Sequence, residues 1–406
     1  MKKLVTLFLA CVVFAGTAFA GGFQLNEHGA RAMAMAGAFT GLANDPSAIY
    51  FNPAGITQLE GTNFYAGTTM ILPLSSYTSP KPFQSETEMI GQTFNIINFY
   101  ATQKIGNRLA VGVSVNNQFG LGTKWPDNWA GRYYAVETEV KTFFFTPVVA
   151  YKILDNLSIS AGATIAIGNV KISRKNPPTK LSANLTIPEF LVTMTSDNTT
   201  AVGFTAGILW KVTDRFQVGA SYRSESKFDF TGTATSNPAS FGPIPLPNGS
   251  ISAPLTTPQN VSVGLAYMPN DMWTVTVDGQ YVGWSSYNTL SVTGVINSSV
   301  PRNYQDTYLV RAGAEYKATD FFSIRFGVLY DHNPVKDAYV EPTLPDADRI
   351  ALNIGFGGKL TSHLSIDLAY MYEGFRDRVV SNSYFGFNGT YSNQAHLFGL
   401  NLAYSL

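Results

Sequence analysis

Residues 152–168 of this 406-residue chain read KILDNLSISAGATIAIG, a short polar turn followed by a strictly alternating run. Apolar side chains occupy the odd positions from Ile159 to Ile167, and small or polar ones the even positions from Ser158 to Ala166. Successive side chains of a β-strand point to opposite faces, so this run has one apolar and one polar face. It is longer than the strands usual in soluble sheets and suits a tilted strand that crosses hydrocarbon.

The polar turn recurs along the chain. Similar turns, usually a Lys followed by a short polar group, lie between alternating runs at 104–109, 152–157, 211–216, 268–272, 317–322 and 359–364. Their spacing of about 40 to 60 residues leaves room for two long strands and a loop. Each turn therefore predicts one end of a β-hairpin.

These hairpins, with one further strand at each end, predict fourteen strands. We expect them at 61–74, 93–104, 108–120, 138–152, 156–172, 199–212, 215–230, 255–268, 272–285, 305–318, 321–332, 347–360, 363–378 and 393–406. An even number puts both mature termini on the periplasmic side, where the short turns belong, and the long loops outside. The final strand alternates to Leu406 and must close against the first. The predicted fold is all-β, a 14-stranded antiparallel transmembrane β-barrel, residues 61–406.

Composition supports this class. Only 13% of the residues are charged, against about 25% in typical soluble domains. No mature segment approaches the roughly 18 unbroken apolar residues of a membrane helix. The 27 basic and 27 acidic residues balance, which argues against a nucleic-acid partner. Aromatic residues just before the short turns fit an interfacial girdle: Tyr151, Trp210, Tyr267 and Tyr316.

The N-terminus indicates export. Lys2 and Lys3 precede an apolar run, and residues 18–20 form a small-x-small cleavage site, so residues 1–20 read as a signal peptide. The mature chain would begin at Gly21. We expect it to lie in the outer membrane of a Gram-negative bacterium. The only cysteine, Cys11, lies within the signal peptide, so neither disulfides nor a cysteine nucleophile enter the prediction.

Residues 21–60 precede the first strand and lack its alternation. The stretch 27–43 is rich in Ala, Gly and Met, too apolar for a solvated tail, and predicts a mostly helical hatch that plugs the lumen. Charged residues on the inward parity would pair with one another and hold this hatch in place. They are Arg223, Asp278, Arg311, Glu315, Arg325 and Asp367, with Arg349 at an outer strand end.

An enzyme is the main alternative class. The four histidines are His28, His332, His363 and His396. None lies in a Gly-x-Ser-x-Gly or metal-ligand pattern, or beside a recognisable Ser and Asp pair. We therefore predict no catalytic residue, no metal and no cofactor. A general diffusion porin is the nearer rival, but it needs neither a hatch nor apolar loops.

The chain resembles the FadL-type outer-membrane transporters of long-chain fatty acids and hydrocarbons. The matching segments, in order over almost the whole chain, are 22–27 (GFQLNE), 52–54 (NPA), 222–225 (YRSE), 331–335 (DHNPV), 345–349 (PDADR) and 396–399 (HLFG). The resemblance implies a hatch, a ligand pocket that touches the mature N-terminus, and passive lateral exit where strand 3 is kinked. Its implied partners are a fatty acid or other hydrophobic small molecule, outer-membrane lipid and lipopolysaccharide, and the barrel-assembly machinery; we expect a monomer.

The resemblance also implies roles for individual residues. Phe23 would lie at the deep pocket; Asn117, Gln118, Phe119 and Gly120 would form the kink; and Asn52, Pro53 and Ala54 would anchor the hatch. Fatty-acid transporters of the family hold the carboxylate with an Arg and a Lys. Arg174 matches the first, whereas the second region offers only Arg302, which leaves neutral aromatic or aliphatic hydrocarbons as alternative cargo. Trp125 and Trp129, with Tyr133 and Tyr134, are expected to line an outer groove.

Overall fold

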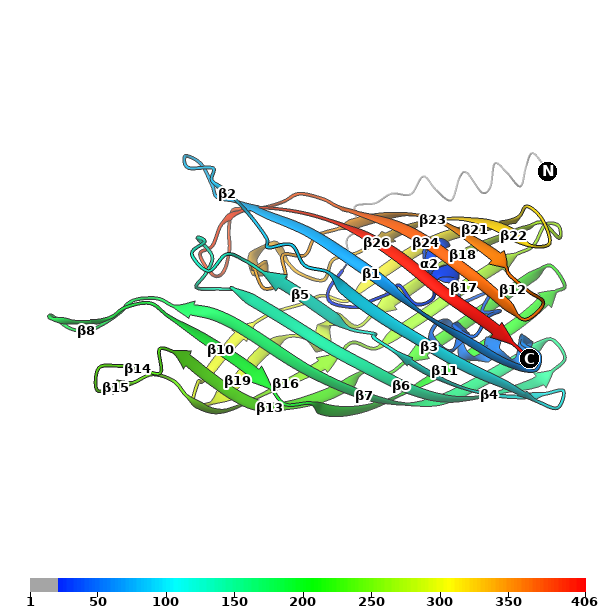
Figure 1. Ribbon diagram of the computed structural model, residues 1–406, viewed down its shortest axis with the longest axis horizontal. Coiled ribbons are helices and arrows are strands. Elements are labelled where there is room, and N and C mark those ends of the chain that lie inside the picture. Colours follow the sequence, from blue (N-terminus) through cyan, green and yellow to red (C-terminus); the bar gives the residue numbers. More distant parts are fainter. Residues whose placement is uncertain (1–20) are drawn as a thin grey trace.

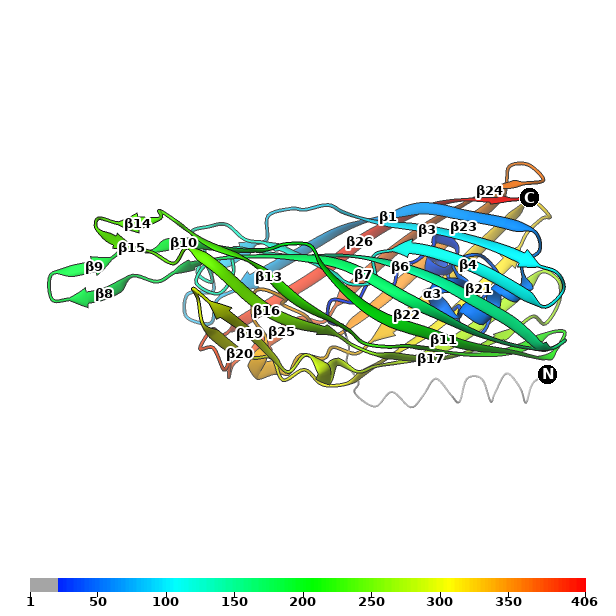
Figure 2. The same cartoon turned by 90° about the horizontal axis from the view of Figure 1, so that it is seen from below.

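The computed structural model describes residues 21–406, so the predicted signal peptide lies outside the described residues. In that part of the chain a closed 14-stranded antiparallel β-barrel surrounds a small N-terminal hatch (Figures 1 and 2). This confirms the predicted fold class. Among residues 21–406 no helix is long and apolar enough to cross a membrane.

Most barrel strands are continuous, and several consist of two segments. The continuous ones are β1 (Thr62–Thr78), β3 (Phe94–Ile105), β6 (Glu137–Leu154), β7 (Leu157–Asn176), β18 (Trp273–Val282), β21 (Thr307–Lys317), β22 (Phe322–Asp331), β23 (Arg349–Lys359), β24 (Leu364–Phe375) and β26 (Gly389–Ser405). The segmented ones are β4 (Leu109–Asn116) with β5 (Gly120–Lys124), β10 (Phe190–Ser196) with β11 (Thr199–Thr213), β12 (Phe216–Arg223) with β13 (Ser226–Asn237), and β16 (Gly249–Thr257) with β17 (Asn260–Tyr267).

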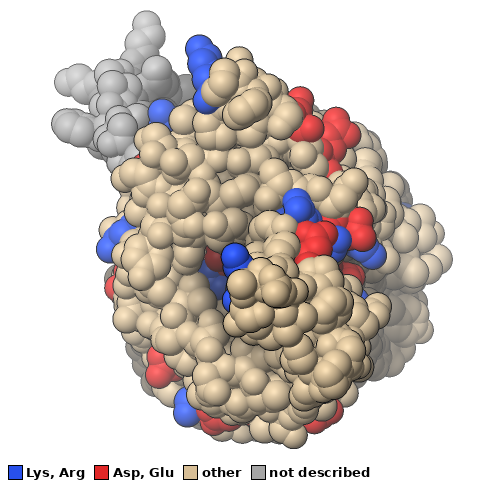
Figure 3. Space-filling view, turned by 90° about the vertical axis from the view of Figure 1, so that its left-hand side faces the viewer, with Lys and Arg blue, Asp and Glu red and all other residues tan. Residues whose placement is uncertain are grey.

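Shorter elements decorate the barrel. In the loops they are β2 (Glu86–Glu88), β8 (Thr179–Ser182), β9 (Leu185–Ile187), β14 (Ser240–Phe241), β15 (Ile244–Pro245), β19 (Thr289–Gly294), β20 (Ser298–Pro301), β25 (Arg378–Val380), η2 (Trp284–Ser286) and η3 (Asp337–Tyr339). The hairpins β8–β9 and β14–β15 project past the other loops, at the end opposite the C-terminus (Figure 1). We call this the loop end, and the end with the short turns the turn end. Seen from the loop end, the surface is mostly uncharged (Figure 3).

The first and last strands close the barrel. β1 pairs with β26 from Asn63 opposite Ser405 to Thr78 opposite Thr390, so neither strand leaves a free edge. The alternation in β7 is as expected: Ile159, Ile165 and Ile167 are exposed on the outer wall, while Ser158 and Thr164 are buried inside. Tyr151, Trp210 and Tyr267 are likewise exposed on the outside next to short turns.

Several predicted strand boundaries were wrong. The expected strand 215–230 breaks at residues 224–225, between β12 and β13, and the alternation of its side chains reverses there. The expected strand 255–268 breaks at Pro258, which has no N–H for a ladder bond. The expected strand 108–120 is interrupted at residues 117–119, where a kink was expected.

The hatch lies inside the barrel. Its helical elements are α2 (Ala30–Ala34), α3 (Ala48–Phe51) and η1 (Pro53–Gln58), and nearly all their side chains are buried. The Arg31 side chain donates to Glu315 (3.0 Å), which also accepts from Arg325 (2.6 Å). The backbone N–H groups of Phe39 and Thr40 donate to Asp278 (2.9 and 2.7 Å). Charged lumen residues therefore hold the hatch both through ion pairs and through its backbone.

Asn52 lies where the hatch meets the barrel wall. Its side-chain NH₂ donates to the carbonyls of Thr40 (3.0 Å) and Ile208 (2.9 Å), and its side-chain oxygen accepts from the N–H of Ala54. Gly207 and Gly219 permit this approach, since a Cβ on either would collide with the Asn52 amide. The fully buried Asn52 amide therefore joins hatch and wall in addition to the contacts of Glu315 and Asp278.

Asn52→Ala is expected to loosen the hatch. The substitution leaves buried carbonyls without donors, a cost of about 1–3 kcal/mol for each unsatisfied group. Hydrogen–deuterium exchange should accelerate in residues 30–58 while the barrel strands stay protected. Asn107→Ala, in an exposed turn, is the matched control. Unchanged exchange in the hatch would contradict the anchoring role.

Candidate functional site

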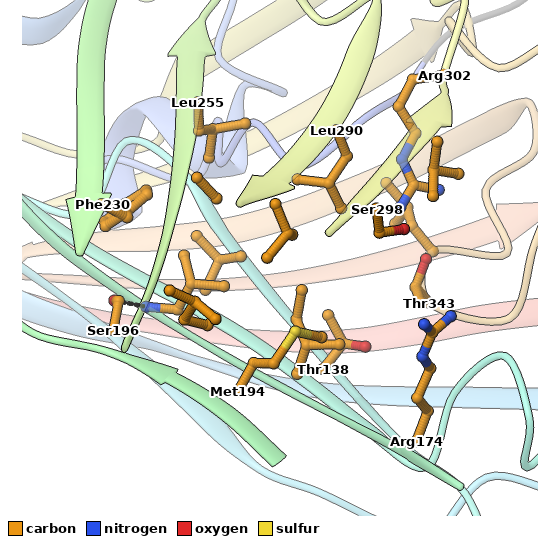
Figure 4. A pocket seen from close by; sticks show the side chains of 18 of the residues that line it. Thr138, Arg174, Met194, Ser196, Phe230, Leu255, Leu290, Ser298, Arg302 and Thr343 are labelled. Carbon is orange, nitrogen blue, oxygen red and sulfur yellow. Dashed lines mark hydrogen bonds between the residues drawn. The ribbon is translucent and has the colours of Figure 1, made fainter. Parts of the chain in front are cut away.

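Two cavities lie between the loop end and the hatch. The upper cavity, of about 280 Å³, is lined by β-strand and loop side chains that are mainly apolar, with Arg174 and Arg302 at one end (Figure 4). The lower cavity, of about 650 Å³, is the one next to the N-terminal residues. It lies between them, the loop ends of β1, β24 and β26, and the interruption between β4 and β5, which together form the predicted third strand and are called strand 3 below. Leu121, Val140 and Leu344 line both cavities, so the two spaces are neighbours.

Phe23 lies at the boundary between them. It is 5% exposed and lines the upper cavity, while Gly22 and Gln24 on either side of it line the lower one. Its ring contacts Trp284 at 4.8 Å, Tyr287 at 5.7 Å and Phe119 at 5.9 Å between centroids, all edge-on. The Phe23 side chain therefore forms part of the partition between the cavities.

Residues 21–26, here named the strap, pair with the interruption of strand 3. The N–H of Gly120 donates to the Phe23 carbonyl (2.9 Å), and the N–H of Leu25 donates to the Gln118 carbonyl (2.9 Å). Backbone groups in the middle of a sheet normally bond to the next strand. At residues 118–120 they bond instead to the strap, so the strap and the wall share hydrogen bonds.

A loop carboxylate holds the start of the strap. Asp346, between β22 and β23, accepts a 2.5 Å hydrogen bond from the N–H of Gly22. Burial raises the pKa of Asp346 to about 7. Gly22 has φ 79°, and a Cβ there would collide with the Trp284 ring, so only glycine fits this position.

The hydrogen-bonded ladder of the wall is interrupted beside the strap. The ladder between β3 and β4 ends at Asn98 opposite Asn116, and in the described chain no ladder joins β3 to β5. The Asn117 side chain bridges this gap: its oxygen accepts from the N–H of Ile97 (2.9 Å) and its NH₂ donates to the Thr142 carbonyl (2.6 Å). The lining of the lower cavity includes Asn117 at this gap and Phe143, which is exposed on the outer wall.

The two predicted cations differ in their surroundings. Arg302 is buried and forms an ion pair with Glu341, and its guanidinium lies 6.0 Å from the Tyr287 ring. The guanidinium of Arg174 has neither a hydrogen bond nor an ion pair to any residue from 21 to 406. Both side chains reach toward the same end of the upper cavity in Figure 4. Only Arg174 therefore presents an uncompensated charge to a ligand.

The predicted tryptophans do not line either cavity. Trp125 and Trp129 stack at 4.3 Å and are buried within the loops. Their indole N–H groups donate to the carbonyls of Pro342 and Ala135, so they hold the loops together, a correction to their expected place in a groove. Tyr133 and Tyr134 do line the upper cavity.

Sequence reasoning missed several residues of the site. Trp284 and Tyr287 enclose Phe23, Glu341 neutralises Arg302, and Asp346 holds the strap. The signal available in the sequence was a loop, residues 341–346, that twice places a Pro beside an acidic residue. The partners of these acidic residues lie far away in the sequence. Within residues 21–406 no group of three or more His, Asp or Glu side chains is arranged to hold a metal ion.

Comparisons with known proteins agree with this architecture. The family described as "Outer membrane protein transport protein (OMPP1/FadL/TodX)" matches residues 11–406. The chain is 25% identical to the long-chain fatty acid transport protein of Salmonella typhi, over 98% of this chain and 97% of that one. It is 23% identical to outer membrane protein P1 of Haemophilus influenzae, over the full length of both.

Solved structures share the fold. A Pseudomonas aeruginosa FadL homologue superposes with a TM-score of 0.82 at 23% identity, over 95% of this chain and 100% of that chain. The Ralstonia pickettii toluene transporter TbuX superposes with a TM-score of 0.72 at 20% identity, over 93% and 98%. At these identities the likeness concerns the fold.

Proposed function

Because the chain belongs to the outer membrane transport protein family OMPP1/FadL/TodX, we propose that it takes up long-chain fatty acids and releases them sideways through the gap in strand 3. The family consists of transport proteins of the outer membrane. Its curated relatives include fatty acid transport proteins, and its solved relatives include toluene transporters. Transport of a hydrophobic small molecule is common to both.

The observation that carries the proposal is the hydrogen bonding between strap and wall. The strap residue that borders the upper cavity, Phe23, accepts a hydrogen bond from Gly120 at the gap. A ligand that displaces Phe23 would pull its carbonyl away from Gly120 and release the interrupted strand. Binding above would thus open the lower cavity and the gap together.

Sideways release suits an acyl chain. Exposing each methylene to water costs about 0.8 kcal/mol, so a long chain crossing an aqueous lumen would meet a barrier of many kcal/mol. The lower cavity instead extends to the outer wall at Phe143. A chain leaving there passes directly from the cavity into hydrocarbon.

The free charge of Arg174 favours an acidic ligand. The Arg174 side chain is half-buried, and a guanidinium that loses part of its hydration without gaining a partner is costly. A carboxylate supplies both charge and paired acceptors. The rest of the upper cavity is mainly apolar, which suits the chain that such a carboxylate carries. A carboxylate head and an apolar tail together describe a fatty acid.

A neutral hydrocarbon is the second candidate cargo. Arg302 is already neutralised by Glu341, so of the two predicted cations only Arg174 is free. Two free cations would bind a carboxylate more strongly than one. Aromatic side chains from Phe23, Tyr287 and Tyr304 also line the cavity and could pack against an aromatic ring.

Uptake into vesicles distinguishes these functions. The purified protein is reconstituted in lipid vesicles, and entry of a long-chain fatty acid, a neutral aromatic hydrocarbon and a small sugar is measured. Each uptake is measured relative to empty vesicles. We expect rapid uptake of the fatty acid, little uptake of the hydrocarbon and no uptake of the sugar. Sugar flux without uptake of either hydrophobic compound would replace the proposal with a diffusion porin.

A further inference from the structure

We propose a second lateral opening in the barrel wall, between β11 and β13, through which the same apolar ligands pass between the upper cavity and the outer leaflet. The inference rests on the proposed function, since it adds a route for the same cargo. It differs in position, because the gap in strand 3 lies between β3 and β5.

The hydrogen-bonded ladder is interrupted here. β11 pairs with β12 up to Thr205 opposite Arg223, and pairing resumes only between β10 and β13, at Ser196 opposite Gly232. In the described part of the chain no ladder joins β11 to β13. Single hydrogen bonds bracket the gap: Ser224 N–H to the Phe204 carbonyl (2.9 Å) and Asp197 N–H to the Thr231 carbonyl (2.8 Å).

The gap is more than a missing bond. Even-numbered side chains such as Val202 point outward in β11, whereas even-numbered side chains such as Val192 are buried in β10. Across the gap the two strands advance by the same number of residues, but β10–β11 contains one residue more than β7 between the pairs Thr195–Lys171 and Thr199–Gly168, which is a β-bulge. The bulge accounts for the reversed side-chain direction between β10 and β11, and a bulge locally disrupts the ladder of hydrogen bonds.

A notch lined by both apolar and polar side chains lies on the outer side. A hollow of about 530 Å³ is lined by Val202, Gly203, Phe204, Tyr222, Ser224, Glu225 and Gln259. Val202 is 70% exposed and Phe204 53% exposed. Val202 lies opposite Ile165 of β7, which belongs to the exposed apolar belt, so the notch opens at the level of hydrocarbon. Its polar rim suits the boundary with lipid headgroups.

One aromatic ring closes the gap from the inside. Phe228 is fully buried and lies parallel to Phe230 at 5.3 Å, and Phe230 lines the upper cavity. Phe228 extends across the lumen side of β11 to Gly168 of β7, where an added Cβ would lie 3.1 Å from its ring. Around it, Ala166 and Ala201 are small and buried. Rotation of this ring would connect the cavity with the notch.

The two gaps share a construction. At strand 3, the Asn117 side chain accepts the N–H of Ile97 that the ladder leaves free. At the second gap, the Ser224 hydroxyl accepts the N–H of Phe204 (2.9 Å) and donates to the Glu225 carbonyl (3.0 Å). Unpaired backbone groups are costly in lipid, and in both places a side chain satisfies one. A side chain can exchange such a bond with a ligand or water without unzipping the sheet.

A disulfide across the second gap tests the proposal. A Cβ on Gly203 would lie 2.8 Å from the Ser226 hydroxyl, so Gly203→Cys with Ser226→Cys places two thiols within bonding reach. The only native cysteine is Cys11. The pair is combined with Gly120→Trp, whose side chain fills the lower cavity beside Leu25. Fatty acid uptake into vesicles is then measured with the pair oxidised and reduced.

We expect Gly120→Trp alone to lower uptake without abolishing it, oxidation of the cysteine pair to remove the remainder, and reduction to restore it. Phe228→Ala in the Gly120→Trp background should raise uptake. Leu329→Ala, which removes a buried side chain from β22, controls for a general loosening of the core. Heat-modifiable migration on gels checks that each barrel is folded.

The outcomes separate the two proposals. Failure of the unmodified protein to take up the fatty acid rejects the proposed function itself. Normal uptake by the unmodified protein, with residual uptake indifferent to oxidation, rejects the second opening alone. Complete loss in Gly120→Trp that Phe228→Ala does not relieve rejects it as well.

Discussion

Arg174→Met is expected to weaken binding of a long-chain fatty acid by about 10- to 150-fold. A hydrogen bond to a charged group contributes about 1.5–3 kcal/mol, and each 1.4 kcal/mol is about tenfold in affinity. Methionine keeps an unbranched apolar side chain in the cavity, so packing changes little. Calorimetric titration of the detergent-solubilised protein measures the effect, with the fatty acid and its methyl ester compared side by side.

The methyl ester is the internal comparison. Because it lacks the carboxylate charge, it should bind the unmodified protein and Arg174→Met equally well. Lys180→Met, in the exposed β8–β9 hairpin, is the matched control for removing a loop cation. The double variant Arg302→Met with Glu341→Met removes an already neutralised pair and should affect the acid less than about threefold, a few tenths of a kcal/mol. Equal losses for acid and ester in Arg174→Met would mean that Arg174 acts by packing and not by charge.

Phe23→Ala is expected to speed the release of bound ligand at least about tenfold. Truncating a buried Phe typically costs about 3–5 kcal/mol, and here the loss falls on the contacts with Phe119, Trp284 and Tyr287 that seat the strap. It also removes the partition between the cavities. Stopped-flow dissociation of a fluorescent fatty acid gives the rate.

Phe39→Ala controls for the loss of an aromatic ring from the hatch. Phe39 is as deeply buried as Phe23 but packs against Phe51, away from both cavities. Release from this variant should match that from the unmodified protein. Slow release from Phe23→Ala, with the barrel intact, would remove the strap from the proposed gating.

The barrel was predictable from the sequence because its signal is local. Alternation in β7 depends on neighbouring residues alone, and the turn at 152–157 precedes it directly. The breaks were harder. At 224–225 the alternation reverses beside a bulge that shows only in the pairing of β10–β11 with β7, and one strand read alone shows only polar residues there.

The site was predictable where a residue acts alone and not where it depends on a distant partner. The interruption at 117–119 is visible in the sequence because Asn117, Gln118 and the following Gly120 lie within an apolar run. The sequence does not show that the charge of Arg302 is neutralised, because its partner Glu341 comes from another loop. Likewise the sequence shows only that Trp125 and Trp129 are aromatic loop residues. Their hydrogen bonds to backbone carbonyls in the structure show that they pack within the loops.

The Asn52 junction bears on what the cell envelope lets through. With its amide fastened to the wall at Ile208 and Asp278 fastened to the hatch backbone, the hatch does not have to leave for cargo to pass. Small hydrophilic antibiotics and ions would then gain no route when the strap moves. A bacterium could hold this protein at high density in its outer membrane without leakage, and planar-bilayer recordings should show no ion current even when fatty acid is present.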